Sequence, residues 1–167
     1  VLPPVRDLQG NAPTVRDARD DKIEDLLGRT QVATDIDSIR ATVHGKVVLI
    51  TGAGGSIGSE ISRQVSQCQP GRLMLLDHDE THLHDARQLI EGPNELVLAD
   101  IRDRERMIEL FAEARPDVVF HAAAHKHVPL LEAHPSEAIR TNVLGTRNVV
   151  DAAVSSGVGR VVHASTD

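Results

Sequence analysis

The stretch KVVLITGAGGSIGS, residues 46–59, decides the fold of this chain. Its apolar residues 47–50 predict a buried strand that ends at Thr51, and glycines follow at positions 52, 54, 55 and 58. A helix is predicted directly afterwards. A helix N-terminus has unpaired N–H groups and partial positive charge, and glycines let the backbone approach a ligand closely, so this order suits a pyrophosphate. A glycine-rich turn without a ligand is the alternative interpretation.

Apolar strands and helices alternate from this stretch to the end of the chain. The predicted strands are 46–51, 72–77, 95–99, 117–121 and 160–164, and the predicted helices are 56–69, 80–91, 103–114 and 135–156. Because the strands are apolar throughout, we expect both sheet faces to be buried, as in a parallel sheet between helices. Right-handed crossovers then give a doubly wound α/β Rossmann domain with strand order 3-2-1-4-5, truncated after strand five.

Residues 1–45 differ from the rest in their charge and proline content. We interpret them as a linker or N-terminal arm, with a short helix over 35–42 that Asp35 would cap. Residues 46–167 are then an incomplete dinucleotide-binding domain that lacks a C-terminal substrate part. Since the chain begins at Val1 and ends directly after an apolar strand, we expect it to be part of a longer protein.

Composition excludes several classes of function. The net charge of −7 argues against nucleic acid as a partner, because phosphate backbones need a basic face. Cys68 is the only cysteine, so an internal disulfide is impossible, which fits a reducing compartment such as the cytoplasm. No apolar run reaches the ~20 residues of a membrane helix, so no membrane contact is expected within this chain. With no Trp, no Tyr and two Phe, the core must be aliphatic.

The carboxyl ends of the parallel strands predict where a ligand lies. Asp77 ends the second strand, 19 residues after Gly58, where an acidic residue accepts hydrogen bonds from the adenosine ribose. A carboxylate there repels a 2′-phosphate, so NAD is favoured as the cofactor, with NADP possible and with His78 able to weaken the repulsion when charged. Alternatively, Asp77 caps the following helix, for which Asp79 is equally well placed.

The other strand ends complete the predicted cofactor site. Asp100 and Ile101 follow the third strand near the expected adenine, and small alanines follow the fourth. The predicted cofactor-binding residues are Thr51, Gly52, Gly55, Ser56, Ile57, Gly58, Asp77, Asp100, Ile101, Ala122, Ala123 and Ala124. Nine histidines raise the question of a metal, but zinc requires three or four ligands with thiolate or carboxylate support, so we predict no metal site.

Six motifs together resemble the extended short-chain dehydrogenase/reductase superfamily. The run in 116–132 and the C-terminal motif more narrowly resemble the nucleotide-sugar 4,6-dehydratases of polysaccharide biosynthesis, which act on UDP-N-acetylhexosamines. The resemblance covers about residues 22–167. The motifs are TGAGGSIGSE (51–60), LLDHDE (75–80), ADIRD (99–103), PDVVFHAAAHKHVPLLE (116–132), TNVLGT (141–146) and HASTD (163–167).

The resemblance implies a redox-neutral elimination, in which hydride leaves sugar C4 for NAD and returns at C6 after the C6 hydroxyl departs. It implies catalytic roles for Thr166, as the hydroxyl that bonds to O4, and for Asp167, as the acid for the leaving hydroxyl. Lys126 resembles a loop residue near nicotinamide and substrate, and Asn142 resembles the asparagine of the fourth helix. A plain surface lysine is the alternative interpretation of Lys126.

The chain also departs from the superfamily pattern. It contains no Tyr, and it lacks the Tyr-x-x-x-Lys pair and the lysine that would follow Asp167. We therefore expect this chain alone to be catalytically inactive, although the parent would be an enzyme. The long members of the family have membrane helices upstream, which would anchor the parent in the inner membrane with this domain on the cytoplasmic side. A nucleotide-sugar epimerase and a non-catalytic dinucleotide-binding module are the alternatives. The expected partners are a UDP-sugar and, through an exposed edge strand, a second copy of the chain.

Overall fold

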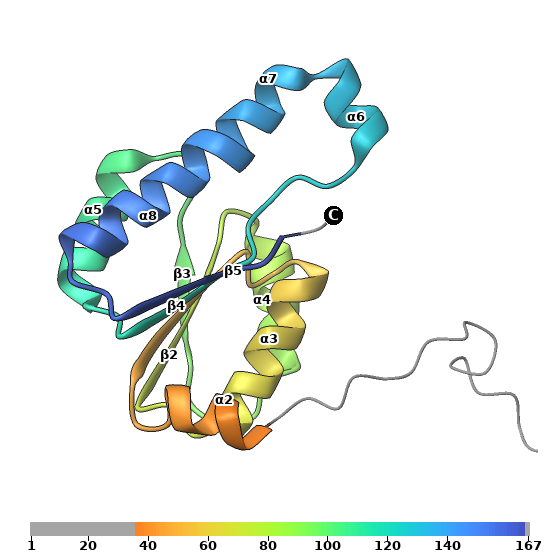
Figure 1. Ribbon diagram of the computed structural model, residues 1–167. Helices are drawn as coiled ribbons and strands as arrows, with labels where there is room; N and C mark the ends of the chain where they lie inside the picture. The colour runs from red at the N-terminus through yellow and green to blue at the C-terminus, as the bar shows by residue number, and fades with distance from the viewer. Residues whose placement is uncertain (1–35, 166–167) are drawn as a thin grey trace, which may run out of the picture. The chain divides into compact units, whose positions relative to one another are not determined.

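The computed structural model describes residues 36–165, and the predictions for residues 1–35, Thr166 and Asp167 lie outside this part (Figure 1). Its five strands form one parallel sheet in the order β3-β2-β1-β4-β5, which confirms the predicted topology. The strands are β1 (Val47–Thr51), β2 (Arg72–Asp77), β3 (Glu95–Leu98), β4 (Val118–His121) and β5 (Arg160–His163). The helices are α2 (Ile36–Val43), α3 (Ser56–Gln67), α4 (Glu80–Gln88), α5 (Arg104–Ala114), α6 (Val128–Ala133), α7 (Pro135–Ala138), the π-helix η3 (Ile139–Gly145) and α8 (Thr146–Ser155).

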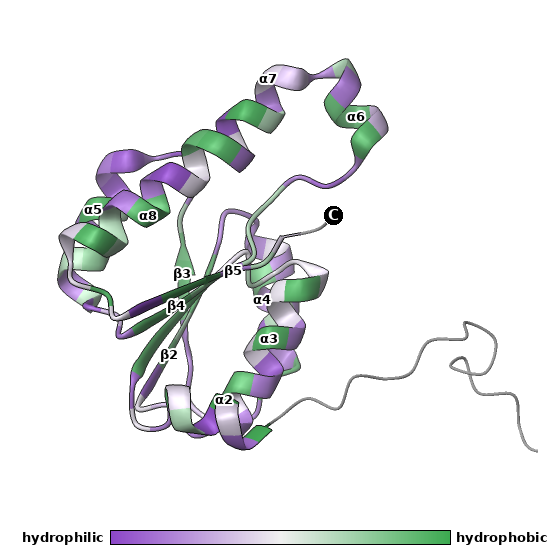
Figure 2. Ribbon diagram, in the orientation of Figure 1, coloured by the Kyte–Doolittle hydropathy of each residue, from purple (hydrophilic) through white to green (hydrophobic). Residues whose placement is uncertain are grey.

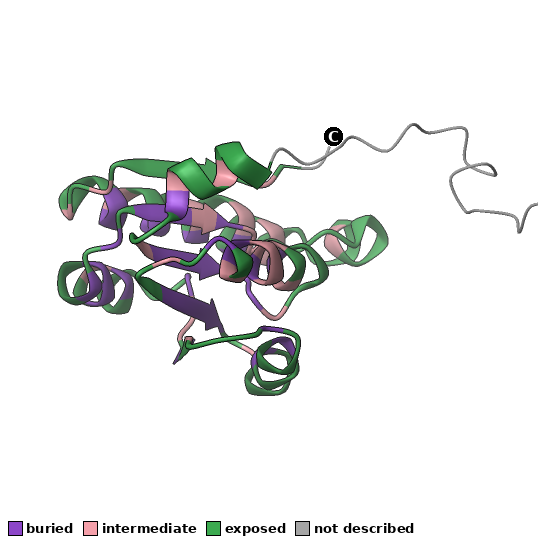
Figure 3. Ribbon diagram, turned by 90° about the horizontal axis from the view of Figure 1, so that it is seen from below, coloured by how far each residue is buried: buried purple, intermediate pink, exposed green. Residues whose placement is uncertain are grey.

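The side chains of the central strands alternate between two hydrophobic cores, because successive residues of a strand point to opposite faces of the sheet. Leu49 and Val119 pack with α5 and α8 on one face. Val48 and Ile50 pack with α2, α3 and α4 on the other. Figure 2 shows the apolar strands between the two layers of helices, and Figure 3 shows buried residues along the strands and the inner sides of the helices.

The edge strands correct one expectation. All four residues of β5 are exposed, and in β3 only Val97 is buried, so not every strand is covered on both faces. An edge strand has a neighbouring strand on one side only, so fewer side chains cover its faces, and an apolar composition alone does not distinguish an edge strand from a central one. Val161 and Val162 remain 38% and 41% exposed.

The fourth predicted helix, over 135–156, is more complex than a single α-helix. Residues 135–155 run continuously through α7, η3 and α8, and a separate short helix, α6, precedes them. The π-helical segment η3 widens the turn at Asn142, and such bulges occur often at functional sites. It brings Asn142 opposite the loop that follows β4.

The segment between residues 36 and 45 packs on the domain. α2 spans Ile36–Val43, and Val43 is completely buried in the core that α3 and α4 cover. Gly45 then turns with φ +69°, and β1 follows. The predicted helix over 35–42 is therefore present as α2, and it contributes Val43 to the hydrophobic core.

Candidate functional site

The strand order reverses between β1 and β4, and a cavity of about 160 Å³ opens at the carboxyl ends of these strands. In doubly wound sheets, ligands bind at such a switch point. A second cavity, of about 590 Å³, adjoins it across the start of α3. The first is lined by Gly52, Gly55, Leu76, Asp77, His78, His82, Ala99, Asp100, Ile101, Arg102, Ala122, Ala123, Ala124, His125 and Thr141.

The glycine loop between β1 and α3 leaves no room for side chains. Gly52 has φ +70°, and a Cβ there would lie 2.6 Å from Ala123 Cα. A Cβ on Gly58 would lie 1.9 Å from the Gly52 carbonyl oxygen. Two backbone segments and a helix therefore meet at van der Waals distance, which only glycine permits. This packing fits the cradle that a pyrophosphate requires.

The N-terminus of α3 is free of any side-chain cap. Its N-cap residue is Gly55, and within residues 36–165 no side chain caps the first turn. Lys126, on the loop after β4, donates from Nζ to Ser56 Oγ over 3.1 Å. An ammonium group and an uncapped helix N-terminus thus converge on one point, and both favour an anion.

Asp77, at the end of β2, holds the glycine loop. Its Oδ2 accepts a hydrogen bond from the Gly54 N–H over 2.9 Å, and its Oδ1 accepts one from the Asp79 N–H over 3.1 Å. The residue is only 8% exposed, yet it lines the first cavity. A carboxylate has about four acceptor positions, so the two backbone bonds leave capacity for a ribose hydroxyl. Asp79, not Asp77, caps α4, through a bond from the His82 N–H of 2.9 Å.

An ion-pair cluster forms the far wall of the first cavity. Arg102 Nη2 lies 2.6 Å from Asp100 Oδ2, and Arg102 Nη1 lies 3.4 Å from Glu137 Oε2 on α7. Burial opposes the ionisation of Asp100, but its hydrogen bonds from Arg102 outweigh burial and hold the pKa of that carboxyl below its usual value. The cluster links the loop after β3 to α7 at the predicted adenine end.

A buried hydrogen-bond chain lies beneath the site. His121 Nδ1 lies 2.6 Å from Thr51 Oγ1, and His121 Nε2 lies 2.9 Å from Thr146 Oγ1, so the chain connects β1, β4 and α8. His163 of β5 stacks on His121 with ring centroids 5.1 Å apart. Burial, together with repulsion from His163, lowers the pKa of His121 to about 4, so the imidazole is neutral at pH 7.

Asn142 fixes the loop that carries Lys126. Its Oδ1 accepts from the His125 N–H over 2.8 Å, and its Nδ2 donates to the His125 carbonyl over 2.9 Å. The Asn142 amide therefore pairs with both the N–H and the carbonyl group of His125, as a residue of a neighbouring strand would. Asn142 thus positions the loop that carries Lys126, and the catalytic role that the family resemblance implies for Asn142 stays a prediction.

The structure brings most of the predicted site residues together. Of the predicted cofactor-binding residues, eight line the first cavity: Gly52, Gly55, Asp77, Asp100, Ile101, Ala122, Ala123 and Ala124. Ser56 and Lys126 line the second cavity, Gly58 supports the loop, Thr51 is buried beneath it, and Ile57 is 53% exposed on α3.

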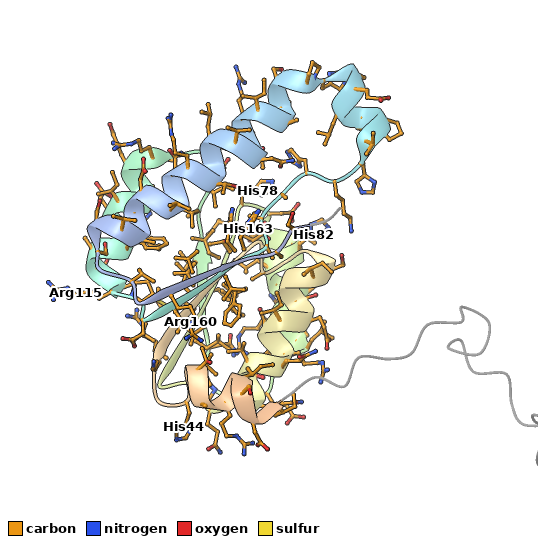
Figure 4. All side chains as sticks on the ribbon, in the orientation of Figure 1. His44, His78, His82, Arg115, Arg160 and His163 are labelled. Carbon is orange, nitrogen blue, oxygen red and sulfur yellow. The ribbon has the colours of Figure 1, made fainter. Side chains whose placement is uncertain are left out.

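Several lining residues were not predicted. Gly54, His82, Arg102 and Thr141 line one or both cavities, although they are not among the predicted site residues. The Asp–Arg pair in ADIRD was the available signal for Arg102. Figure 4 shows His78, His82 and His163 toward one end of the sheet and His44 at the other.

Within residues 36–165, no group of three or more His, Cys, Asp or Glu side chains is arranged to hold a metal ion. None of the helices described there has the length and apolar character needed to cross a membrane.

The chain is similar to several known proteins. Over its whole length the chain is 44% identical to the probable polysaccharide biosynthesis protein EpsC of Bacillus subtilis, of which it covers 29%. It is 35% identical to the UDP-N-acetylglucosamine 4,6-dehydratase (inverting) of Campylobacter jejuni over 73% of the chain and 36% of that enzyme. The structure of UDP-glucose-4-epimerase from Stenotrophomonas maltophila with bound NAD superposes with a TM-score of 0.66 at 30% identity, over 72% of this chain and 37% of that one.

The chain thus spans about a third of the length of these relatives. A family profile described as polysaccharide biosynthesis protein matches residues 48–167, which include the glycine loop, Asp77 and both cavities. The match shows that the chain belongs to this family of polysaccharide biosynthesis proteins, and its Rossmann topology superposes on the corresponding part of the epimerase structure.

Proposed function

We propose that this chain binds NAD and forms the cofactor half of a nucleotide-sugar 4,6-dehydratase that acts on a UDP-N-acetylhexosamine. The observation that carries the proposal is the arrangement of Asp77 against the glycine loop. One buried carboxylate holds the Gly54 amide and borders the cavity where an adenosine ribose would lie. The epimerase structure with bound NAD supports this choice of cofactor.

The chain's own residues would bind and orient the two ligands. The α3 N-terminus and Lys126 would hold the pyrophosphate, Asp77 the ribose diol, and the apolar wall near Ile101 the adenine. NAD would supply the reversible acceptance of a hydride. The second cavity, next to Lys126, has space for part of a nucleotide-sugar. Thr166 and Asp167 are proposed to contact the sugar at O4 and O6.

The dehydratase assignment is supported by the similarity to the Campylobacter jejuni enzyme, and an epimerase remains the second candidate because of the superposition on UDP-glucose-4-epimerase. The two reactions differ in their products. Incubation of the full-length parent protein with NAD and UDP-N-acetylglucosamine in deuterated water should yield a 4-keto-6-deoxy sugar that carries deuterium at C5, detected by NMR. A C4 epimer without a keto sugar would support the epimerase instead.

We also propose that the 167-residue chain alone binds NAD but does not convert the sugar. Isothermal titration with NAD should give saturable binding, weakened because part of the pocket wall would come from the remainder of a longer protein. Absence of binding at millimolar NAD would contradict the cofactor assignment. A 4-keto-6-deoxy product from this chain alone would contradict the expected inactivity.

A further inference from the structure

Two imidazoles stand at the end of the first cavity where the adenosine ribose would lie. His78 follows β2, and His82 lies in the first turn of α4, and both line the cavity. Their side chains are 59% and 67% exposed, so they are accessible to protons and to a ligand. Neither residue has a role in the core.

We propose that His78 and His82 are specificity-determining residues, and that the preference of this site for NAD over NADP weakens as the pH falls through the range in which histidines gain charge. The inference rests on the proposed function, because it assumes that the adenosine ribose lies against Asp77. It concerns the group at the ribose 2′ position, which is a hydroxyl in NAD and a phosphate in NADP.

Asp77 cannot turn away from a 2′-phosphate. Both of its oxygens accept backbone hydrogen bonds, from Gly54 and Asp79, and the residue is almost fully buried. Rotation of the carboxylate would leave two partly buried N–H groups without their acceptors, which is costly. The position of the repelling carboxylate is therefore fixed, and the repulsion of a 2′-phosphate changes only with the charge of the neighbouring groups and of the phosphate itself.

The groups that face His78 are mostly acidic. Its Nδ1 lies 3.2 Å from Asp77 Oδ1, Asp79 is on the same turn, and Asp100 faces it from the end of β3. Arg102 is the neighbouring cation, and it is already paired with Asp100 and with Glu137. With neutral imidazoles, this end of the cavity therefore carries an excess of negative charge.

The groups that face His82 come from three elements. Its Nδ1 lies 3.4 Å from Asp79 Oδ2. Across the second cavity stand His125, Lys126, His127, His134 and Glu137, from the loop after β4 and from the start of α7. Lys126 is directed to Ser56, at the pyrophosphate position. Protonation of His78 and His82 would thus add two positive charges where the acidic groups dominate, and histidine is the side chain that charges between pH 5 and 8.

The test compares the affinities for NAD and NADP by isothermal titration at pH 8.0 and pH 5.5. The phosphate of NADP itself takes up a proton near pH 6, which alone reduces the repulsion at low pH. The double variant His78→Gln with His82→Gln isolates that contribution, since glutamine stays neutral. His84→Gln is the matched control, because His84 lies on the same helix, pairs with Gln88 and lines neither cavity.

We expect the ratio of NADP affinity to NAD affinity to rise between pH 8.0 and pH 5.5 in all three proteins. The rise should be roughly tenfold larger in the unmodified chain and in the His84→Gln variant than in the double variant. An equal rise in all three proteins would overturn the inference while leaving NAD binding intact. A His84→Gln variant that behaved like the double variant would overturn it as well. Failure of the unmodified chain to bind NAD at pH 8.0 would instead refute the proposed function on which the inference rests.

Discussion

At the scale of single residues, Gly58 shows how tightly the glycine loop is packed. A Cβ at this position would lie 1.9 Å from the Gly52 carbonyl oxygen, and backbone atoms cannot yield as a flexible side chain can. We expect Gly58→Ala to destabilise the fold by about 3 kcal/mol and to abolish NAD binding. Gly159→Ala is the control, because its Cβ would lie an ordinary 3.4 Å from the Asp117 carbonyl oxygen. Urea denaturation measures both, and equal losses of stability would contradict the packing argument.

The buried His121 side chain makes the stability of the fold depend on pH. Its pKa in the folded protein is about 4, below the 6.5 of an unfolded chain, so between these values the unfolded state binds more protons. The stability contributed by the neutral imidazole is therefore complete above pH 6.5 and is lost as the pH falls toward 4. Between pH 6.5 and 5, we expect a loss of roughly 1.5 kcal/mol in the free energy of unfolding.

The variant His163→Gln checks the cause of this dependence. Removal of the stacked imidazole removes its repulsion, so the pKa of His121 should rise and the loss of stability between pH 6.5 and 5 should shrink. The exposed position of His163 makes a folding defect from the substitution itself small. A pH dependence that is unchanged in His163→Gln and also in His121→Asn would refute the assignment.

At the scale of elements, the π-helix η3 and the loop after β4 act as one unit through Asn142. Asn142→Ala removes both hydrogen bonds to His125 and should release the loop that carries Lys126. We expect faster amide hydrogen exchange at residues 124–130 and weaker NAD binding, with a cost of about 1–2 kcal/mol in stability. The exposed Arg147, one turn later, provides the control Arg147→Ala. Unchanged exchange in the loop of the Asn142→Ala variant would contradict this coupling.

The sequence predicted the elements whose signals are local. The strand order follows from the strand pattern and from chirality rules, and the structure confirms it. Asp77 and Ala122 line the first cavity, and their contacts with a cofactor stay a prediction. The π-helix and α6 were missed, because an extra residue in a helical turn leaves the apolar pattern almost unchanged. The Thr51–His121–Thr146 chain joins residues up to 95 positions apart, and only the tertiary fold shows that their side chains meet.

At the scale of the whole domain, β5 is an edge strand with apolar residues on both faces, and this predicts self-association. Val161 and Val162 are exposed, and unpaired strand edges promote pairing with another chain. We expect the chain to associate at high concentration in sedimentation experiments. Val162→Lys should shift it toward the monomer, because a charge on an edge strand opposes pairing. Val128→Lys, on the exposed surface of α6, is the control, and an equal shift in both variants would contradict the role of the edge.

The double use of Asp77 has a consequence for attempts to re-engineer the cofactor preference. The carboxylate that would bind the ribose also accepts hydrogen bonds from the Gly54 and Asp79 N–H groups. A substitution that changes the preference for NAD over NADP therefore also changes the structure of the glycine loop. Replacement of Asp77 by a small neutral residue, intended to admit NADP, would also remove the acceptor that holds the glycine loop. A successful redesign must first supply another acceptor for the Gly54 amide.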